Sequence, residues 1–148
     1  MPKVKVAIQK LHPAAILPRY GSLCAAGADL YALPGDPTTI APGETTLLHT
    51  GIAMEIPEGL VGLIYARSGL ATKQGLAPAN KVGVIDSDYR GEIMVSLYNQ
   101  SSVPRTVEGG ERIAQLVLTP YITGEFEECD SLTATERGSG GFGSTGSK

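Results

Sequence analysis

Cysteine, histidine, phenylalanine and tryptophan are rare or missing in the sequence. Its 148 residues include 2 Cys, 2 His, 2 Phe and no Trp. Cys24 and Cys129 stand far apart and form no Cys-x-x-Cys pair, which is typical of a reducing cytoplasm and not of a disulfide framework. His12 and His49 occur in unrelated contexts. This argues against a His/Cys transition-metal site but leaves open a hard cation held by oxygen ligands.

Long hydrophobic runs and an excess of positive charge are also missing. No apolar run reaches membrane-spanning length, and no N-terminal stretch has the pattern of a signal peptide. The net charge of -3 argues against broad nucleic-acid binding, because duplex-binding domains are usually basic. A small anionic ligand held by a few arginines is compatible with this charge. We expect a cytoplasmic protein, with a nuclear or organellar location still open for a eukaryotic source.

Glycine and proline, in contrast, are frequent, with 19 and 10 residues. They separate short β-rich runs, which predicts an all-β sandwich or barrel, and the length fits one domain with a real core. A single short helix is expected at 67–72, with Ser68 as its N-terminal cap. The first strand should bury one face. Strands are expected at 4–8, 45–49, 52–56, 60–65, 105–107 and 112–118.

The stretch 80–92 predicts a β-hairpin with a polar bend. Residues 81–85 are mostly apolar and β-branched, and a second strand pattern follows the bend. Such a hairpin would bring the Asn80 amide, the Asp86 carboxylate and the Tyr89 ring to one small ligand. Asp86 is the strongest candidate for a general base, because a rigidly held carboxylate can accept a proton from a positioned water. The alternative is a bend aspartate that accepts hydrogen bonds from nearby N–H groups.

Polar residues elsewhere are more ambiguous. Arg67, Ser68 and Gly69 could bind an anion through a guanidinium, a hydroxyl and exposed backbone N–H groups, or they could form a surface turn. Gln115 interrupts an apolar run, and spacing alone favours a structural role for it. Asp29 either caps a turn or orients an arginine or a metal-bound water.

The last twelve residues, 137–148, contain one large apolar side chain, Phe142, and cannot build a core. The spacing Gly138-x-Gly140-x-x-Gly143 fits a dinucleotide-binding pattern, but no strand precedes it and no helix follows. Two interpretations remain. The tail is either a flexible terminus, or a lid in which the ring stacks on a planar ligand while hydroxyls and N–H groups hold phosphate oxygens.

Taken in order, five stretches resemble the motifs of the trimeric dUTPase family (deoxyuridine triphosphate nucleotidohydrolases). They are AGADL at 26–30, ARSGL at 66–70, GVIDSDYRG at 83–91, GERIAQL at 110–116 and RGSGGFGSTG at 137–146. The third and fifth are highly specific, whereas Ala66 departs from the proline of many members. The resemblance implies a jelly-roll-like β-barrel (1–136) that forms a homotrimer, with an arm (137–148) closing over a neighbour's active site.

The resemblance also implies a reaction, in which dUTP and water give dUMP and pyrophosphate. This would supply the dTMP precursor and keep uracil out of DNA. Mg²⁺ would be bound through the phosphates and waters, with no direct protein ligand. By motif match, Asp86 activates the water that attacks the α-phosphorus, while Asp29 and Arg112 support the site. Neither nucleic acid nor membrane is an expected partner.

The remaining roles concern substrate binding. Tyr89 would pack against the deoxyribose and leave no room for a 2′-hydroxyl. Two alternatives stay open: a dCTP deaminase, which shares the fold class, and a non-catalytic jelly-roll binding module. The uracil would be read by Asn80, Gly83, Val84, Ile85 and Met94; the phosphates would be bound by Arg67, Ser68, Gly69 and Gln115; the lid would consist of Arg137, Phe142, Gly143, Ser144 and Thr145.

Overall fold

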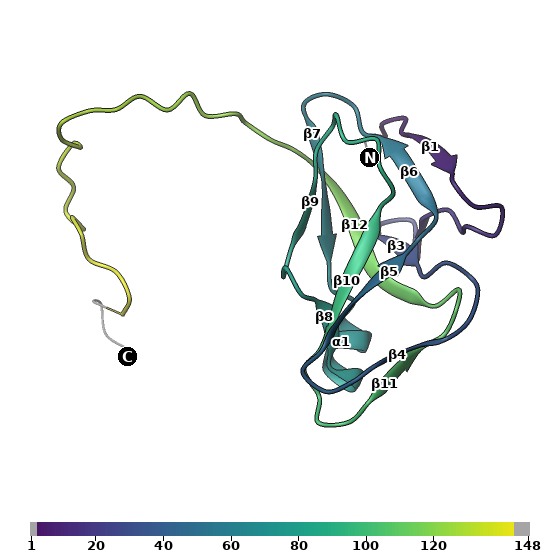
Figure 1. Cartoon of the computed structure of the whole chain (residues 1–148). Coiled ribbons are helices and arrows are strands. Elements are labelled where there is room, and N and C mark those ends of the chain that lie inside the picture. Colours follow the sequence, from purple (N-terminus) through teal and green to yellow (C-terminus); the bar gives the residue numbers. More distant parts are fainter. Residues whose placement is uncertain (1–2, 144–148) are drawn as a thin grey trace.

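The computed structural model describes residues 3–143, which form β-strands and one short helix (Figure 1). The prediction of an all-β protein is therefore confirmed. The elements are β1 (Ala7–Lys10), β2 (Arg19–Tyr20), β3 (Ala28–Tyr31), β4 (Thr38–Ile40), β5 (Thr45–His49), β6 (Ile52–Glu55), β7 (Leu60–Tyr65), α1 (Ser68–Gln74), β8 (Leu76–Pro78), β9 (Gly83–Ile85), β10 (Met94–Asn99), β11 (Arg105–Val107) and β12 (Arg112–Pro120).

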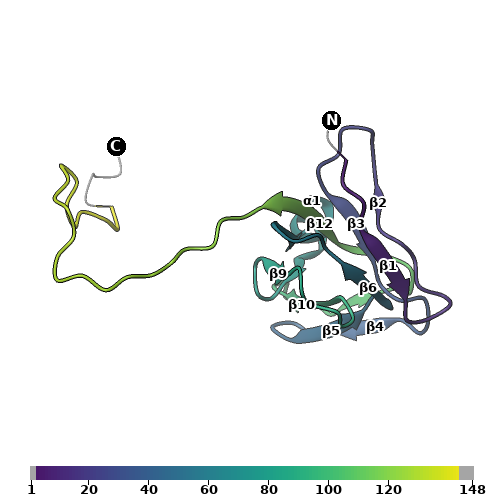
Figure 2. The same ribbon diagram turned by 90° about the horizontal axis from the view of Figure 1, so that it is seen from above.

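The strands form antiparallel sheets of two, three and five strands. The largest has the order β2-β3-β12-β7-β9, and the next has the order β5-β10-β8. The pairs β1-β6 and β11-β4 complete the described part. Seen from above, β3 and β12 lie on one side of the molecule and β5 with β4 on the other (Figure 2). The buried core contains side chains from both sides, including Leu30 and Ile113 from β3 and β12 and Ile40 and Leu48 from β4 and β5.

The core follows in large part from alternation along the strands, most regularly in β3 and β10. In β10 every second residue is buried, beginning at Val95 and including Leu97. Leu30 in β3 and Ile113 in β12 are also almost completely buried and belong to the same cluster. Because the side-chain period of a strand is two, Leu30, Val95 and Leu97 face inward between half-buried neighbours. In β12, Ile113 and Ala114 are both buried, at the place where the register of the strand shifts.

The predicted first strand exists, but the prediction that it buries one face is wrong for β1. All four residues of β1 are exposed, and Ile8 is 36% exposed. Among the described residues the strand pairs only with β6, in a two-stranded sheet, and all of its residues stay exposed to solvent. Val6, just before the strand, does pack against the core. Three other predicted strands, at 45–49, 60–65 and 105–107, have the expected bounds.

The predicted hairpin at 80–92 is also wrong as a pairing. The two strands form as expected, but β9 pairs with β7, whereas β10 pairs with β5 and β8. The intervening residues, 86–93, are too many for a tight turn, and they cross from one sheet to the other. We call residues 86–93 the crossover loop. Its place between two sheets leaves the side chains of Asp86 and Tyr89 exposed.

The short helix was predicted in the right place with the wrong cap. Arg67 occupies the N-cap position with extended backbone angles and makes no capping hydrogen bond through its side chain. Ser68 is the first helical residue, so its hydroxyl is not in the capping position. The helix ends at Gly75, whose φ of 70° is the left-handed conformation that favours glycine there.

The chain leaves the sheets after Pro120. Residues 121–143 contain no strand or helix and extend away from the other elements (Figure 1). We call residues 121–143 the C-terminal extension. Ile122 and Phe126 are 96% and 99% exposed, so they contribute nothing to this chain's own core. The division predicted at residue 137 stays a prediction. Within the described residues, no helix is long and apolar enough to cross a membrane.

Candidate active site

Asp29 lies at the centre of a charged cluster built from two neighbouring strands, β3 and β12, and from the residue that precedes α1. One oxygen, Oδ1, accepts a hydrogen bond of 2.8 Å from Arg67 Nε, and Oδ2 accepts one of 3.4 Å from Arg112 Nη1. The aspartate side chain is only 14% exposed, whereas Arg112 is 52% exposed. The carboxylate therefore aims two guanidinium groups and leaves their outer edges available to an anion.

Gln115 fixes the segment before Arg67. It stands opposite Asp29 on one side of β12 and opposite Tyr65 on the other. Its Nε2 donates a hydrogen bond of 2.8 Å to the carbonyl oxygen of Ala66. A Cβ at Gly27 would lie 2.4 Å from the glutamine Oε1, so only glycine permits this close approach. We call Asp29, Arg67, Arg112 and Gln115 the arginine cluster.

Ser68 and Gly69 follow directly at the start of α1, and both are exposed. A Cβ built at Gly69 meets no atom within 4 Å. The first backbone N–H groups of a helix have no partner inside the helix, so this open surface can receive an anion's oxygens. The structure thus brings together the residues predicted to bind phosphate.

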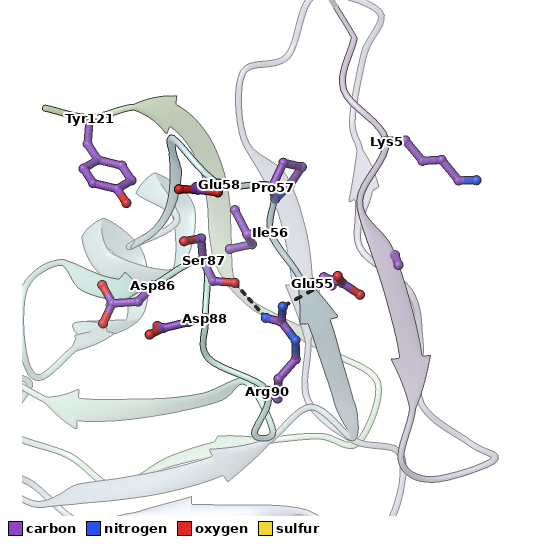
Figure 3. A pocket seen from close by; sticks show the side chains of 11 residues that line it. Lys5, Glu55, Ile56, Pro57, Glu58, Asp86, Ser87, Asp88, Arg90 and Tyr121 are labelled. Atoms are coloured by element: carbon purple, nitrogen blue, oxygen red, sulfur yellow. Dashed lines mark hydrogen bonds and ion pairs between the residues drawn. The ribbon is translucent and has the colours of Figure 1, made fainter.

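Asp86 begins the crossover loop, and its carboxylate makes no hydrogen bond to any residue within 3–143. The shape of the loop is held by Arg90. Its Nη1 donates hydrogen bonds of 2.7 Å to Ser87 O and 3.1 Å to Tyr89 O, and its Nη2 lies 3.6 Å from Glu55 Oε1 (Figure 3). The carboxylate of Asp86 is exposed on this braced loop, so that a water can approach it within hydrogen-bond distance.

The crossover loop borders an open hollow of about 940 Å³. In Figure 3 the side chains of Asp86 and Asp88 lie on one side of the loop, and Arg90 points toward Glu55. Among the described residues, the lining includes no member of the arginine cluster. It consists of Lys5, Ala7, Glu55, Ile56, Pro57, Glu58, Asp86, Ser87, Asp88, Arg90 and Tyr121.

Tyr89 is turned back onto its own loop. Its hydroxyl donates a hydrogen bond of 2.9 Å to the carbonyl oxygen of Glu92. A Cβ at Gly91 would lie 2.4 Å from that hydroxyl oxygen, so the glycine lets the ring fold back. The ring remains 40% exposed. One part of it can therefore contact a ligand.

The Glu92 side chain forms hydrogen bonds with the last residue of β5 and with the segment that follows it. Its two oxygens engage Gly51 N–H at 2.8 Å and His49 Nδ1 at 2.9 Å. Burial raises the pKa of Glu92, but the hydrogen bonds from His49 and Gly51 outweigh it and leave the pKa below its ordinary value. This contact is not apparent from the sequence, because no local pattern links residues 43 positions apart.

The predicted uracil-reading residues surround β9. This strand is the last in its sheet, so one edge of its backbone has no strand partner in the described part of the chain. The Asn80 amide nitrogen lies 3.4 Å from where a Cβ of Gly83 would stand, so the amide covers this glycine. Val84 is exposed, and Ile85 and Met94 are half-buried. A flat base could meet backbone groups and an amide here.

The two parts of the candidate site are separated within one chain. Ile85, next to Asp86, pairs with Gly62. Tyr65, the end of β7, lies three residues further, which is about 10 Å along a strand, and Arg67 follows two residues later. The arginine cluster and the crossover loop therefore lie apart within one chain, separated along β7.

The predicted lid residues that the structure describes, Arg137, Phe142 and Gly143, belong to the C-terminal extension. Arg137 Nε donates a hydrogen bond of 2.8 Å to Gly140 O within the C-terminal extension. Phe142 is fully exposed and has a φ of 52°, and Gly143 also has a positive φ. Ser144 and Thr145 lie outside the described residues. Within the described residues, the C-terminal extension runs away from the strands that carry both parts of the site in the same chain (Figure 1).

The strands and their order define an all-β protein of the jelly-roll-like class. The dUTPase family model matches residues 13–146. The deoxyuridine 5'-triphosphate nucleotidohydrolase of Desulfitobacterium hafniense is 53% identical over 145 residues, covering 97% of this chain and 96% of the relative. That of Acinetobacter baylyi is 46% identical over 147 residues, covering 99% and 98%. The chain therefore belongs to the dUTPase family, which confirms the resemblance.

Solved structures agree with this assignment. The dUTPase of Staphylococcus bacteriophage 80alpha with dUpNHpp has a TM-score of 0.88, with 28% sequence identity. The match covers 97% of this chain and 99% of that chain. The match includes most of the C-terminal extension as well as the sheets, because 97% of the chain is covered.

Proposed function

We propose that this member of the dUTPase family hydrolyses dUTP to dUMP and pyrophosphate. Family membership carries the proposal, and the arrangement of the site supports it. A cluster of arginine, glutamine and helix-start N–H donors suits a triphosphate, and the open edge of β9 beside Asn80 suits a pyrimidine. The overall net charge of -3 means that the ligand's charge must be met by these concentrated donors.

In the proposed reaction Asp86 acts as general base. It accepts a proton from a water whose oxygen forms a bond to the α-phosphorus, while the bond from that phosphorus to the bridging oxygen of pyrophosphate breaks. Attack and departure must lie in line, and the arginine cluster holds the phosphates for this. The exposed carboxylate of Asp86, free of hydrogen bonds within 3–143, supports this role.

Mg²⁺ fits the site as an ion bound to the substrate. The described residues contain no group of three or more His, Cys, Asp or Glu side chains that could hold a metal. Both oxygens of Asp29 already accept hydrogen bonds from arginines. Triphosphate oxygens and waters would thus supply the ligands, as is common for this cation, and the ion would neutralise charge on the leaving pyrophosphate.

The active protein is proposed to be a homotrimer with composite sites. The separation of Asp86 from Arg67 within one chain supports this, because one substrate needs both. A neighbouring chain would bring its arginine cluster to the crossover loop, and residues 137–148 of a chain would close over the site. The extension's exposed Phe142 supports an aromatic lid over the base. Size-exclusion chromatography with light scattering measures the assembly directly.

A nucleotide panel tests the proposed function. The full chain with Mg²⁺ is assayed for pyrophosphate release from dUTP, dTTP, dCTP and UTP. We expect cleavage of dUTP and little turnover of the others. The proposed site would exclude a thymine methyl and a 2′-hydroxyl by their size, and a cytosine amino group by its mismatched hydrogen bonding. Ammonia release from dCTP would indicate a deaminase instead. Binding without turnover of any nucleotide would indicate a non-catalytic module.

A further inference from the structure

Tyr89 is placed by a contact that the proposed reaction does not itself use. The phenol oxygen donates to the carbonyl oxygen of Glu92, so the position of the ring depends on where that carbonyl stands. A flexible loop would let the ring swing away from the sugar. The crossover loop must therefore be anchored near residue 92.

That anchor consists of hydrogen bonds to the segment 49–52. The Glu92 carboxylate accepts from Gly51 N–H at 2.8 Å and contacts His49 Nδ1 at 2.9 Å. The next residue, Ile93, donates its N–H to Ile52 O at 2.8 Å, and its carbonyl oxygen accepts from the Thr50 hydroxyl. Thr50 and Ile93 are completely buried. We call these contacts the Glu92 anchor.

The segment that receives the anchor is itself fixed. Gly51 has a φ of 71°, and a Cβ there would lie 2.8 Å from Leu33 and 3.0 Å from Ala15. The His49 side chain is 61% exposed, while that of Glu92 is 21% exposed. The carboxylate thus reaches from the loop into a rigid and partly buried place, and the imidazole covers its outer side.

We infer that Glu92, with His49 and Gly51, is a positioning residue that sets the discrimination between deoxyribose and ribose through Tyr89. The inference rests on the proposed function. Each oxygen of the Glu92 carboxylate takes part in a hydrogen bond that fixes the loop backbone at residue 92. The backbone carbonyl of Glu92 in turn fixes the Tyr89 ring at the place where a 2′-hydroxyl would enter. Within the described residues, the hydrogen bonds of the Glu92 side chain go to His49 and Gly51 and none goes to Asp86.

The test measures kcat and KM for dUTP and UTP in the wild-type chain and in Glu92→Ala. Loss of both side-chain contacts should lower the dUTP-to-UTP ratio of kcat/KM by about ten-fold. The loss should arise from a raised KM for dUTP and faster use of UTP, while kcat for dUTP changes less. A variant with only a structural defect would lose activity toward both nucleotides in proportion.

Two further variants and a control distinguish a positioning role of Glu92 from general damage to the enzyme. Glu92→Gln keeps an acceptor for Gly51 N–H and a polar group beside His49, so it should restore most of the ratio. His49→Ala removes one contact and should give a smaller fall. The matched control is Glu44→Ala, since Glu44 is exposed beside the opposite end of β5 and makes no side-chain hydrogen bond in the described part.

An unchanged ratio in folded Glu92→Ala overturns the inference. If that variant does not fold, an unchanged ratio in His49→Ala overturns it equally. A wild-type chain that releases no pyrophosphate from dUTP overturns the proposed function, and the positioning role with it. A wild-type chain that turns over dUTP and UTP equally removes only the sugar-selecting role of Tyr89 and Glu92.

Discussion

The arginine cluster and the crossover loop are built in opposite ways. The cluster gathers Asp29, Arg67 and Arg112 from distant parts of the sequence, and its ion pairs span 38 and 83 positions. The loop is continuous in sequence, and Arg90 braces it through carbonyls one and three residues away. The cluster therefore depends on the register of a sheet. The loop depends on local geometry and on two distant contacts, that of Arg90 with Glu55 and that of Glu92 with the segment 49–52.

The largest effect is expected from changing Asp86 in the crossover loop. Asp86→Asn keeps the shape of the side chain but removes the proton acceptor, so kcat for dUTP should fall by about a thousand-fold, while substrate binding remains. Asp88→Asn is the matched control, because it removes a neighbouring exposed carboxylate that lines the same hollow. Near-normal kcat in Asp86→Asn, measured by pyrophosphate release, would remove Asp86 as the base.

Truncation before Arg137 should have the next largest effect. The chain without residues 137–148 should keep its fold and its assembly, since Arg137 and Phe142 make no contact with the strands in the described structure. Activity should fall about a hundred-fold, because closure over the substrate is lost. Full activity in the truncated chain, after its mass is verified by light scattering, would show that the tail is only a flexible terminus.

Mixing the two inactive proteins tests whether the sites are composite. Asp86→Asn and the truncated chain are refolded together, and each is also refolded alone. If Asp86 and the arm of one site come from different chains, the mixture regains part of the wild-type rate. A mixture no more active than its components would place Asp86 and the arm in the same chain.

A smaller effect is expected in the arginine cluster. Asp29→Asn removes the charge that aims Arg67 and Arg112, so KM for dUTP should rise about ten-fold. Asp36→Asn, at an exposed loop position, is the matched control. The dependence of KM on salt concentration provides a second measure of how much the charges of the arginine cluster contribute to binding. If the KM of Asp29→Asn equals that of the control, the arginines do not need the carboxylate for binding.

The smallest expected effect concerns stability in acid. The folded chain holds the pKa of Glu92 below its reference value of 4.5. Its contribution is therefore fully present above about pH 4.5 and is lost as the pH falls through the lower folded value. Unfolding by denaturant should show wild type more stable than Glu92→Gln by less than about 1 kcal/mol at pH 7. A difference that stays constant to pH 3 would contradict this account.

Strand positions were largely predictable because alternation and glycine or proline boundaries are local signals. Residues 60–65 and 105–107 have their predicted bounds for this reason. The pairing of strands was not predictable in the same way. The stretch 80–92 resembles a hairpin locally, yet β9 and β10 join different sheets, because each has a partner elsewhere in the chain. The exposure of β1 likewise reflects what lies beside it, which alternation does not report.

The sequence by itself determined the all-β class, the family and the chemical identity of the candidate groups, since these follow from composition, local pattern and motif order. Only the tertiary structure decided how the groups are arranged. It placed both oxygens of Asp29 on two arginines, connected Gln115 to Ala66, and joined Glu92 to His49. The physical reason is distance along the chain. Such contacts depend on sheet register and on which strand ends meet.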